Sequence, residues 1–260
     1  FAGGEELGAS AAVTVDGEYV VDLWGGDRNK NGDPWEQDTI VNVYSTTKTM
    51  ASICMLMLAD RGQVDFDVPV AEYWPEFAAN GKDSVLVRHV MTHQTGCSGF
   101  PRPVTPEELY DHSLMADLLA GMQPWWAPGT APGYHAVTQG TLQAEILRRI
   151  DGRTLGTFFR EEVTTPLDAD FHIGLPLSEG RRVAQLDVPE GRIDEFVEGQ
   201  PDSIAVKTFR SCPLDGTETE TDEWRRAEIP AAGGIGNARS ISRVHSAIAC
   251  GGGLNGITLM

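Results

Sequence analysis

Residues 45–62 predict a helix that must lie inside the fold, and this segment constrains the chain more than any other. The stretch STTKTMASICMLMLADRG places Met50, Ile53 and Met57 at helical spacing, and Gly62 supplies a stop signal. Apolar side chains cover most of the circumference, so no face is left for solvent. We therefore expect this helix at the buried centre of a domain, with other elements packed around it.

Two strands are predicted ahead of the helix. Residues 10–24, SAAVTVDGEYVVDLW, alternate apolar and polar side chains on both sides of Asp16 and Gly17. An Asp-Gly dipeptide tolerates the positive φ angles of a tight hairpin turn. The chain therefore opens with two antiparallel strands.

The rest of the chain favours helices. Helical patterns occupy residues near 106–120 and about 136–150, and a short helix near the C-terminus has Ser240 as its predicted N-cap. Residues 176–228 are polar with weak periodicity, which indicates a surface excursion or lid.

Strand signals crowd the first 45 residues and helices follow them, which predicts an α+β fold. We expect an antiparallel sheet flanked by helices, with a mostly helical or lid region over about 60–230. The whole of 1–260 is interpreted as one domain, because the length and the 41% hydrophobic content suit one sizeable core.

Composition excludes some classes of function. The net charge of −18 argues against a nucleic-acid partner, because phosphate contacts need clustered Lys and Arg. No apolar run of about eighteen residues predicts a membrane span. The four cysteines form no CxxC pair, which favours reduced thiols and a cytoplasmic location. The chain begins at Phe1, so an upstream signal peptide stays an open alternative.

Ser45 and Lys48 lie one helical turn apart, so both side chains emerge on the same face. Burial beside apolar neighbours lowers a lysine pKa, and the neutral amine can then accept the proton of the serine hydroxyl. The start of the helix also favours negative charge that develops on a tetrahedral intermediate. Nucleophile, base and part of an oxyanion hole would then come from one turn.

The Ser-x-x-Lys pattern alone is weak, since it arises by chance about once in a chain of this length. The alternative is a capping serine beside a surface lysine. Lysine is scarce here, however, and Lys48 opens the one helix that is almost entirely apolar. The residues by themselves leave both interpretations open.

Four blocks along the chain resemble the β-lactamase-like serine hydrolases and their penicillin-binding-protein relatives, and most of all the family VIII carboxylesterases. The blocks are VYSTTKTMASICMLMLADRGQVDFDVPVAEYWPEF, VRHVMTHQTG, WAPGTAPGYHAVTQGTLQAEILRRIDGRTLGTFFREEVTTPL and AAGGIGNARSISRV. They cover about residues 10–174 and 230–250. The resemblance implies the fold of class C β-lactamases and penicillin-binding proteins, and catalysis through an acyl-enzyme without metal or organic cofactor.

The resemblance also implies a second motif, Tyr-x-Asn or a looser Tyr-x-x, which Tyr134 opens in this chain. Tyr134 would face Lys48 and share proton transfer from and to Ser45 as part of a general base pair. Ala136 stands where β-lactamases and penicillin-binding proteins carry an amide side chain. This departure favours small or medium acyl esters over β-lactams or peptides as substrates.

Two further aromatic residues are weaker candidates for substrate binding. His135 follows Tyr134, and Trp126 belongs to a loop that could wall an acyl pocket. A solvent-facing side chain is an equal alternative for His135, and ordinary packing is at least as good an alternative for Trp126. His89 and His93 are spaced like a zinc pair, but without an HExxH pattern or a third ligand we interpret them as structural.

The third motif of the family, a Lys-Thr-Gly or His-x-Gly triplet on a strand that faces the nucleophile, does not occur between Gly251 and Met260. We expect a sheet edge and a core face to be left uncovered. The C-terminal part could be missing, could belong to a second chain or to another copy in a homo-oligomer, or could be lost in a degenerate homologue. β-Lactamase, D-alanyl carboxypeptidase and acyltransferase activity remain alternatives, as does an inactive binding or assembly protein.

Overall fold

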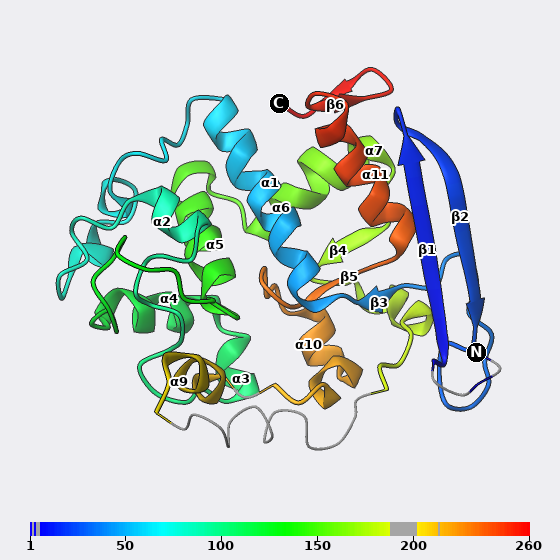
Figure 1. Cartoon of the computed structure of the whole chain (residues 1–260), viewed down its shortest axis with the longest axis horizontal. Coiled ribbons are helices and arrows are strands. Elements are labelled where there is room, and N and C mark those ends of the chain that lie inside the picture. Colours follow the sequence, from blue (N-terminus) through cyan, green and yellow to red (C-terminus); the bar gives the residue numbers. More distant parts are fainter. Residues whose placement is uncertain (2, 4–5, 188–201, 213) are drawn as a thin grey trace.

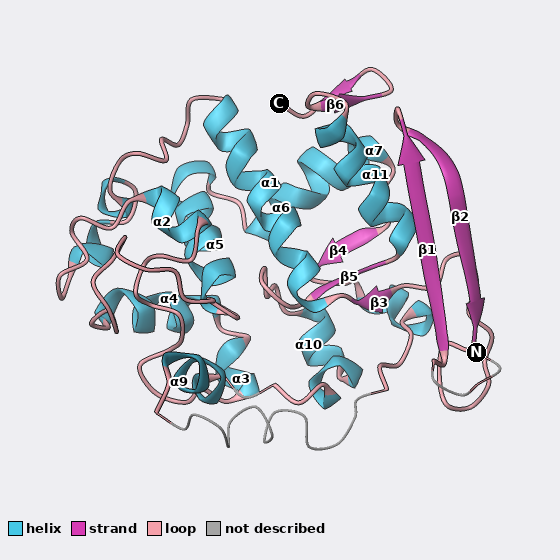
Figure 2. Ribbon diagram, in the orientation of Figure 1, coloured by secondary structure: helices cyan, strands magenta, loops and turns pink. Residues whose placement is uncertain are grey.

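Helix α1 (Thr47–Asp60) runs through the middle of the molecule in the computed structural model, which describes residues 1, 3, 6–187, 202–212 and 214–260 (Figure 1). Most of its side chains are buried, and Met50 and Met55 are fully inaccessible. The predicted central helix is therefore confirmed. It separates a mainly helical half from a half that contains the strands (Figure 2).

The N-terminal hairpin consists of β1 (Gly8–Val15) and β2 (Glu18–Gly26), which pair antiparallel. Asp16 and Gly17 form the turn with φ angles of 52° and 84°, as the Asp-Gly dipeptide predicts. One face of the hairpin packs on α11 (Ala238–Ala249). The other face exposes apolar side chains, among them Val13, Val15, Val20 and Leu23.

A three-stranded antiparallel sheet lies next to α1. Its order is β3 (Val41–Asn42), β5 (Gly234–Gly236) and β4 (Phe171–Ile173). The Gly234 N–H donates to Thr47 Oγ1 at 2.8 Å, and a Cβ built on Gly234 would meet that oxygen at 2.4 Å. The first residue of α1 is thereby fixed against the central strand. Strands β6 (Gly253–Leu254) and β7 (Ile257–Thr258) form a small hairpin near the C-terminus.

The remaining helices gather mainly on the other side of α1 (Figure 1). They are α2 (Val87–Met91), α3 (Pro106–Leu109), α4 (His112–Gly121), α5 (Thr138–Asp151), α6 (Leu155–Phe159), α7 (Thr165–Leu167), α9 (Ile204–Ser211) and α10 (Asp222–Arg226). A π-helical turn (Arg160–Thr164) joins α6 to α7, and five 3₁₀ turns complete the described elements: Tyr44–Thr46, Val70–Glu72, Pro75–Ala78, Leu177–Arg182 and Thr217–Glu220.

Two local predictions are wrong. The single helix expected near 106–120 is two helices, because the Asp111 carboxylate accepts from the Leu114 N–H at 3.1 Å and starts α4 afresh. The N-cap of α11 is Asn237 and not Ser240. The Asn237 side chain accepts from the Ser240 N–H, and Ser240 Oγ accepts from the Asn237 N–H, so Ser240 completes a capping box from inside the helix.

Other expectations meet mixed outcomes. All four cysteines are free, in line with the predicted reduced set. No helix within the described ranges is long and apolar enough to cross a membrane. The predicted lid over 176–228 falls partly on 188–201 and 213, which lie outside the described residues. The division of the chain into one domain with a region over 60–230 stays a prediction, as do the location and the oligomeric state.

Candidate active site

Ser45 sits in the 3₁₀ turn that leads into α1, and its side chain is exposed. Tyr44, just before it, has a φ of 40°, a left-handed conformation that is uncommon for a residue with a side chain. Lys48 follows on the first turn of α1, and its Nζ lies 3.2 Å from Ser45 Oγ. The structure thus brings the two residues of the Ser-x-x-Lys pattern into hydrogen-bonding contact.

The Lys48 side chain is buried, with 7% of its surface exposed. Its Nζ donates to the Ala136 carbonyl at 2.7 Å and to the Ala231 carbonyl at 2.9 Å. Burial lowers the pKa of Lys48 to about 8. When the amine is neutral, its two N–H groups are satisfied by the carbonyls, so its lone pair is left for the serine hydroxyl.

Tyr134 reaches the same point from the loop before α5. Its Oη lies 2.5 Å from Ser45 Oγ, and its ring centroid lies 4.9 Å from Lys48 Nζ. The tyrosine is 46% exposed, so the meeting point of the three side chains is open to a reactant. Lys48 Nζ and Tyr134 Oη, which come from distant parts of the chain, therefore both contact Ser45 Oγ.

A cavity of about 290 Å³ opens beside Ser45 and Tyr134. Its wall is mostly apolar, and five of its eleven lining residues come from α9 and the residues directly after it. The lining residues are Tyr44, Ser45, Tyr134, Ala136, Val137, Phe209, Cys212, Leu214, Asp215, Gly216 and Ala232. Such a pocket suits an apolar group with few polar anchors.

Of the predicted site residues, Ser45 and Tyr134 line this cavity, whereas Lys48, His135 and Trp126 do not. His135 is fully buried, and its ring nitrogens bond to the Gly133 carbonyl at 2.5 Å and to Thr95 Oγ1 at 2.6 Å. Trp126 packs edge-on against the His135 ring, and its Nε1 donates to the Ala131 carbonyl. Both side chains donate hydrogen bonds to carbonyls of the loop that carries Tyr134 and so stabilise this loop.

Several residues of the cavity wall escaped sequence reasoning. Phe209, Cys212 and Leu214 come from the polar stretch after residue 176, which carries no motif that predicts a site. Glu218 was missed for the same reason. Its buried carboxylate accepts a hydrogen bond from Tyr44 Oη at 2.8 Å, next to Ser45. Only the position of Tyr44 beside Ser45 gave a usable signal.

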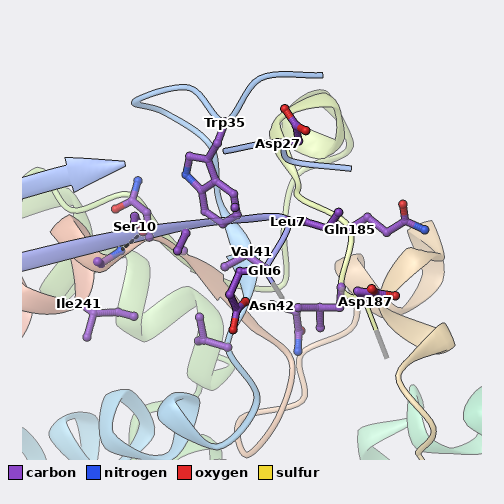
Figure 3. A pocket seen from close by; sticks show the side chains of 17 residues that line it. Glu6, Leu7, Ser10, Asp27, Trp35, Val41, Asn42, Gln185, Asp187 and Ile241 are labelled. Carbon is purple, nitrogen blue, oxygen red and sulfur yellow. Dashed lines mark hydrogen bonds between the residues drawn. The ribbon is translucent and has the colours of Figure 1, made fainter. Parts of the chain in front are cut away.

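A larger cavity, of about 820 Å³, lies between β1, β3 and the start of α11 (Figure 3). Trp35 and Asn42 are among its lining residues, and the hydrogen bond from the Ala238 N–H to Ser10 Oγ crosses its wall. None of Ser45, Lys48 and Tyr134 lines it. The smaller cavity is therefore the candidate active site.

A family model described as Beta-lactamase matches residues 2–258. The chain belongs to the Beta-lactamase family. The match extends beyond the blocks at 10–174 and 230–250 and includes the polar stretch between them. The predicted family and the predicted α+β fold class are thereby confirmed. The similarity covers more of the chain than the sequence blocks indicated.

Relatives with esterase and β-lactamase names support this assignment. Esterase/beta-lactamase LipL of Mycobacterium tuberculosis is 38% identical over 267 residues, which cover 97% of this chain and 61% of LipL. A solved family VIII carboxylesterase superimposes with a TM-score of 0.90 at 42% identity, over 100% of this chain and 69% of that protein. A penicillin-binding protein homolog from Caulobacter crescentus gives a TM-score of 0.87 at 42% identity, with the same coverage. The chain thus spans about three fifths of LipL and about two thirds of the solved proteins.

Proposed function

We propose that the protein is a serine hydrolase that cleaves small or medium carboxylic esters through an acyl-enzyme on Ser45. The observation that carries this proposal is the position of Lys48 Nζ, which two backbone carbonyls hold 3.2 Å from Ser45 Oγ. These carbonyls accept hydrogen bonds only, so a neutral amine there turns its lone pair toward the serine. A lysine with a pKa of about 8 is neutral in a useful fraction of molecules near neutrality.

Acylation then proceeds with Lys48 as the base. Lys48 Nζ takes the Ser45 hydroxyl proton while Ser45 Oγ forms a bond to the carbonyl carbon of the ester. The bond from that carbon to the alcohol oxygen breaks next. Tyr134 Oη, 2.5 Å from Ser45 Oγ, donates its proton to the departing alcohol and regains one from the Lys48 ammonium.

Deacylation uses the same groups in reverse. A water molecule enters the space left by the alcohol and attacks the acyl carbon. The Lys48 and Tyr134 pair accepts the proton of the water and returns a proton to Ser45 Oγ as the acid leaves. The exposed side of Tyr134 gives water a route to this point.

The cavity wall favours esters over β-lactams or peptides. The Ala136 side chain can only pack there, and its carbonyl is already bound to Lys48. Val137, Phe209 and Leu214 offer apolar contact to an acyl or alcohol chain. An amide substrate would find few partners for its N–H group on this wall.

Intact mass spectrometry of the full-length protein tests this proposal. The protein is incubated with a p-nitrophenyl acyl ester and, separately, with a penicillin, with Ser45→Ala as the control. A Ser45 adduct from the ester alone, together with turnover, supports the carboxylesterase. Adduct formation and release from the penicillin would move the activity to the β-lactamase side of the family. No adduct in a folded full-length protein would overturn the proposal in favour of an inactive binding homologue.

A further inference from the structure

His93 accepts two hydrogen bonds from the backbone of the loop that carries Tyr134. The Gly133 N–H donates to the His93 carbonyl at 2.9 Å, and the His135 N–H donates to His93 Nδ1 at 3.1 Å. These two amide groups flank Tyr134 in sequence. The His93 ring also packs against the Tyr134 ring, with centroids 5.1 Å apart. One residue therefore binds the backbone on both sides of the tyrosine and contacts its side chain.

The hydrogen bonds fix the tautomer of His93 and show which ring nitrogen of His135 donates. His93 Nδ1 accepts from a backbone N–H, so it carries no proton. His135 Nδ1 faces the Gly133 carbonyl and must donate, which leaves His135 Nε2 to accept from the Thr95 hydroxyl. Thr95 Oγ1 in turn accepts from the Cys97 N–H at 3.1 Å. His93 is thus neutral, and a neutral His135 gives each of these groups a hydrogen-bond partner.

Burial keeps the rings in that state. It lowers the pKa of His135 to about 4 and also lowers the pKa of His93, with a smaller effect of Lys48 in each case. His93 has a φ of 61°, in the left-handed region where a residue with a side chain needs support from its surroundings. The His93 ring, on a strained backbone, therefore packs between the rings of Tyr134 and His135.

We propose that His93 is a positioning residue for Tyr134, and that its Nδ1 acceptor, together with the Thr95–His135 contact, holds the phenol at the nucleophile. This role rests on the proposed esterase function for its catalytic consequence. Neither His93 nor Thr95 belongs to the cavity wall, so neither is expected to touch the substrate. Loss of either hydrogen-bonding group should therefore lower kcat and leave KM almost unchanged.

Two substitutions at His93 separate the acceptor from the ring. In His93→Asn the amide oxygen can occupy the place of Nδ1, and asparagine tolerates a positive φ. In His93→Gln the amide reaches the place of Nε2 and leaves the His135 N–H without its partner. We expect His93→Gln to lower kcat for a p-nitrophenyl ester about 10- to 100-fold. His93→Asn should keep kcat within about threefold of wild type, and KM should hold in both.

A second pair keeps the test decisive if His93→Gln fails to fold. Thr95→Val removes the hydroxyl that donates to His135 Nε2, whereas Thr95→Ser retains it. Thr95→Val should lower kcat and Thr95→Ser should not. Equal loss of kcat in both members of a pair, no loss in either, or a change confined to KM would overturn the positioning role.

Amide hydrogen exchange tests the positioning role of His93 independently of esterase activity. The His135 N–H should exchange slowly in the wild type and in His93→Asn, and faster in His93→Gln, whether or not any ester is hydrolysed. Unchanged exchange in folded His93→Gln would overturn the positioning role while esterase activity stood. Absent ester turnover with the expected exchange pattern would overturn the esterase and leave the backbone grip intact.

Discussion

Tyr44 Oη donates a hydrogen bond of 2.8 Å to the buried carboxylate of Glu218, 174 residues further along the chain. Glu218 Oε2 also accepts from the Gly216 N–H at 2.7 Å. Tyr44 precedes Ser45, the proposed nucleophile, and Gly216 belongs to the cavity wall. One carboxylate therefore ties the strained turn before Ser45 to the far wall of the cavity. Burial, followed by Glu218, raises the pKa of Tyr44, so the phenol keeps its donating proton.

The first prediction concerns Tyr44→Phe. This change removes a donor from a buried carboxylate, so it should lower the free energy of unfolding by about 1–3 kcal/mol. It also frees the turn that presents Ser45, and kcat/KM for an ester should fall about tenfold. Denaturant unfolding and steady-state kinetics measure the two effects. Tyr73→Phe is the control, because the Tyr73 hydroxyl accepts from the Asp65 N–H on another part of the surface. Equal kinetic losses in both variants would contradict the link to the nucleophile.

The sequence predicted the features of the structure that depend on residues close together in the chain. The Asp16-Gly17 hairpin, the central helix and the contact of Ser45 with Lys48 depend on residues at most a turn or a strand apart. The Tyr44–Glu218 contact depends on how the chain folds back, and no spacing in the sequence signals it. Tyr134 lies between these extremes, because only the family resemblance linked it to Ser45.

Capping failed as a prediction for a similar reason. Both Asn237 and Ser240 are good N-cap residues, and the sequence cannot tell which one keeps a non-helical backbone. The structure shows that Asn237 has extended φ and ψ angles and that the strand β5 ends just before it. The place where the strand stops therefore decides where the helix begins.

The second prediction is a pH profile set by Lys48. In the proposed mechanism the active form has a neutral Lys48, and burial lowers the pKa of Lys48 from 10.5 to about 8. Below that value the neutral fraction falls about tenfold per pH unit, so kcat/KM should rise tenfold per unit from pH 6 and level off above about pH 8. Initial rates with a p-nitrophenyl ester, corrected by Ser45→Ala, measure this. A rise that continues to pH 10 would mean that Lys48 keeps its ordinary pKa.

The third prediction is that Gly140→Ala lowers both the stability of the protein and its kcat, although Gly140 does not line the active-site cavity. Gly140 lies in α5, where a Cβ would come within 2.5 Å of the Ala231 nitrogen and 2.6 Å of the Pro230 carbonyl carbon. Backbone cannot yield as a flexible side chain can, so the unfolding free energy should fall by about 1–3 kcal/mol despite the better helix propensity of alanine. The shift also moves the Ala231 carbonyl from Lys48 Nζ, and kcat should fall.

Gly121→Ala is the matched control for that change. Gly121 ends α4, and nothing lies within 4 Å of a Cβ built on it. The variant should be as stable as the wild type or more stable, by up to about 1 kcal/mol, with an unchanged kcat. Thermal denaturation and ester kinetics on both variants decide the matter. A Gly140→Ala protein with wild-type stability and kcat would show that Ala231 can move without harm.

The last prediction concerns Lys82, whose side chain is completely inaccessible. Its Nζ donates to the Ala79 carbonyl at 2.7 Å, to the Ala120 carbonyl at 2.9 Å and to the Met122 carbonyl. The ammonium thus satisfies carbonyls that the end of α4 leaves without helical partners. Burial lowers the pKa of Lys82, because the ammonium loses its hydration.

Lys82→Met keeps the length and the apolar stem of the side chain but leaves these carbonyls buried without a donor. The loss of partners outweighs the relief from burying a charge, because more than one acceptor is abandoned, and the unfolding free energy should fall by about 2–4 kcal/mol. The kcat of the folded fraction should stay unchanged, since Lys82 does not line the active-site cavity. Lys30→Met, at an exposed ion pair with Asp187, should leave the denaturation midpoint unchanged. Equal stability of Lys82→Met and Lys30→Met would contradict this prediction. It would mean that water reaches the three carbonyls and that the hydrogen bonds of Lys82 do not stabilise the end of α4.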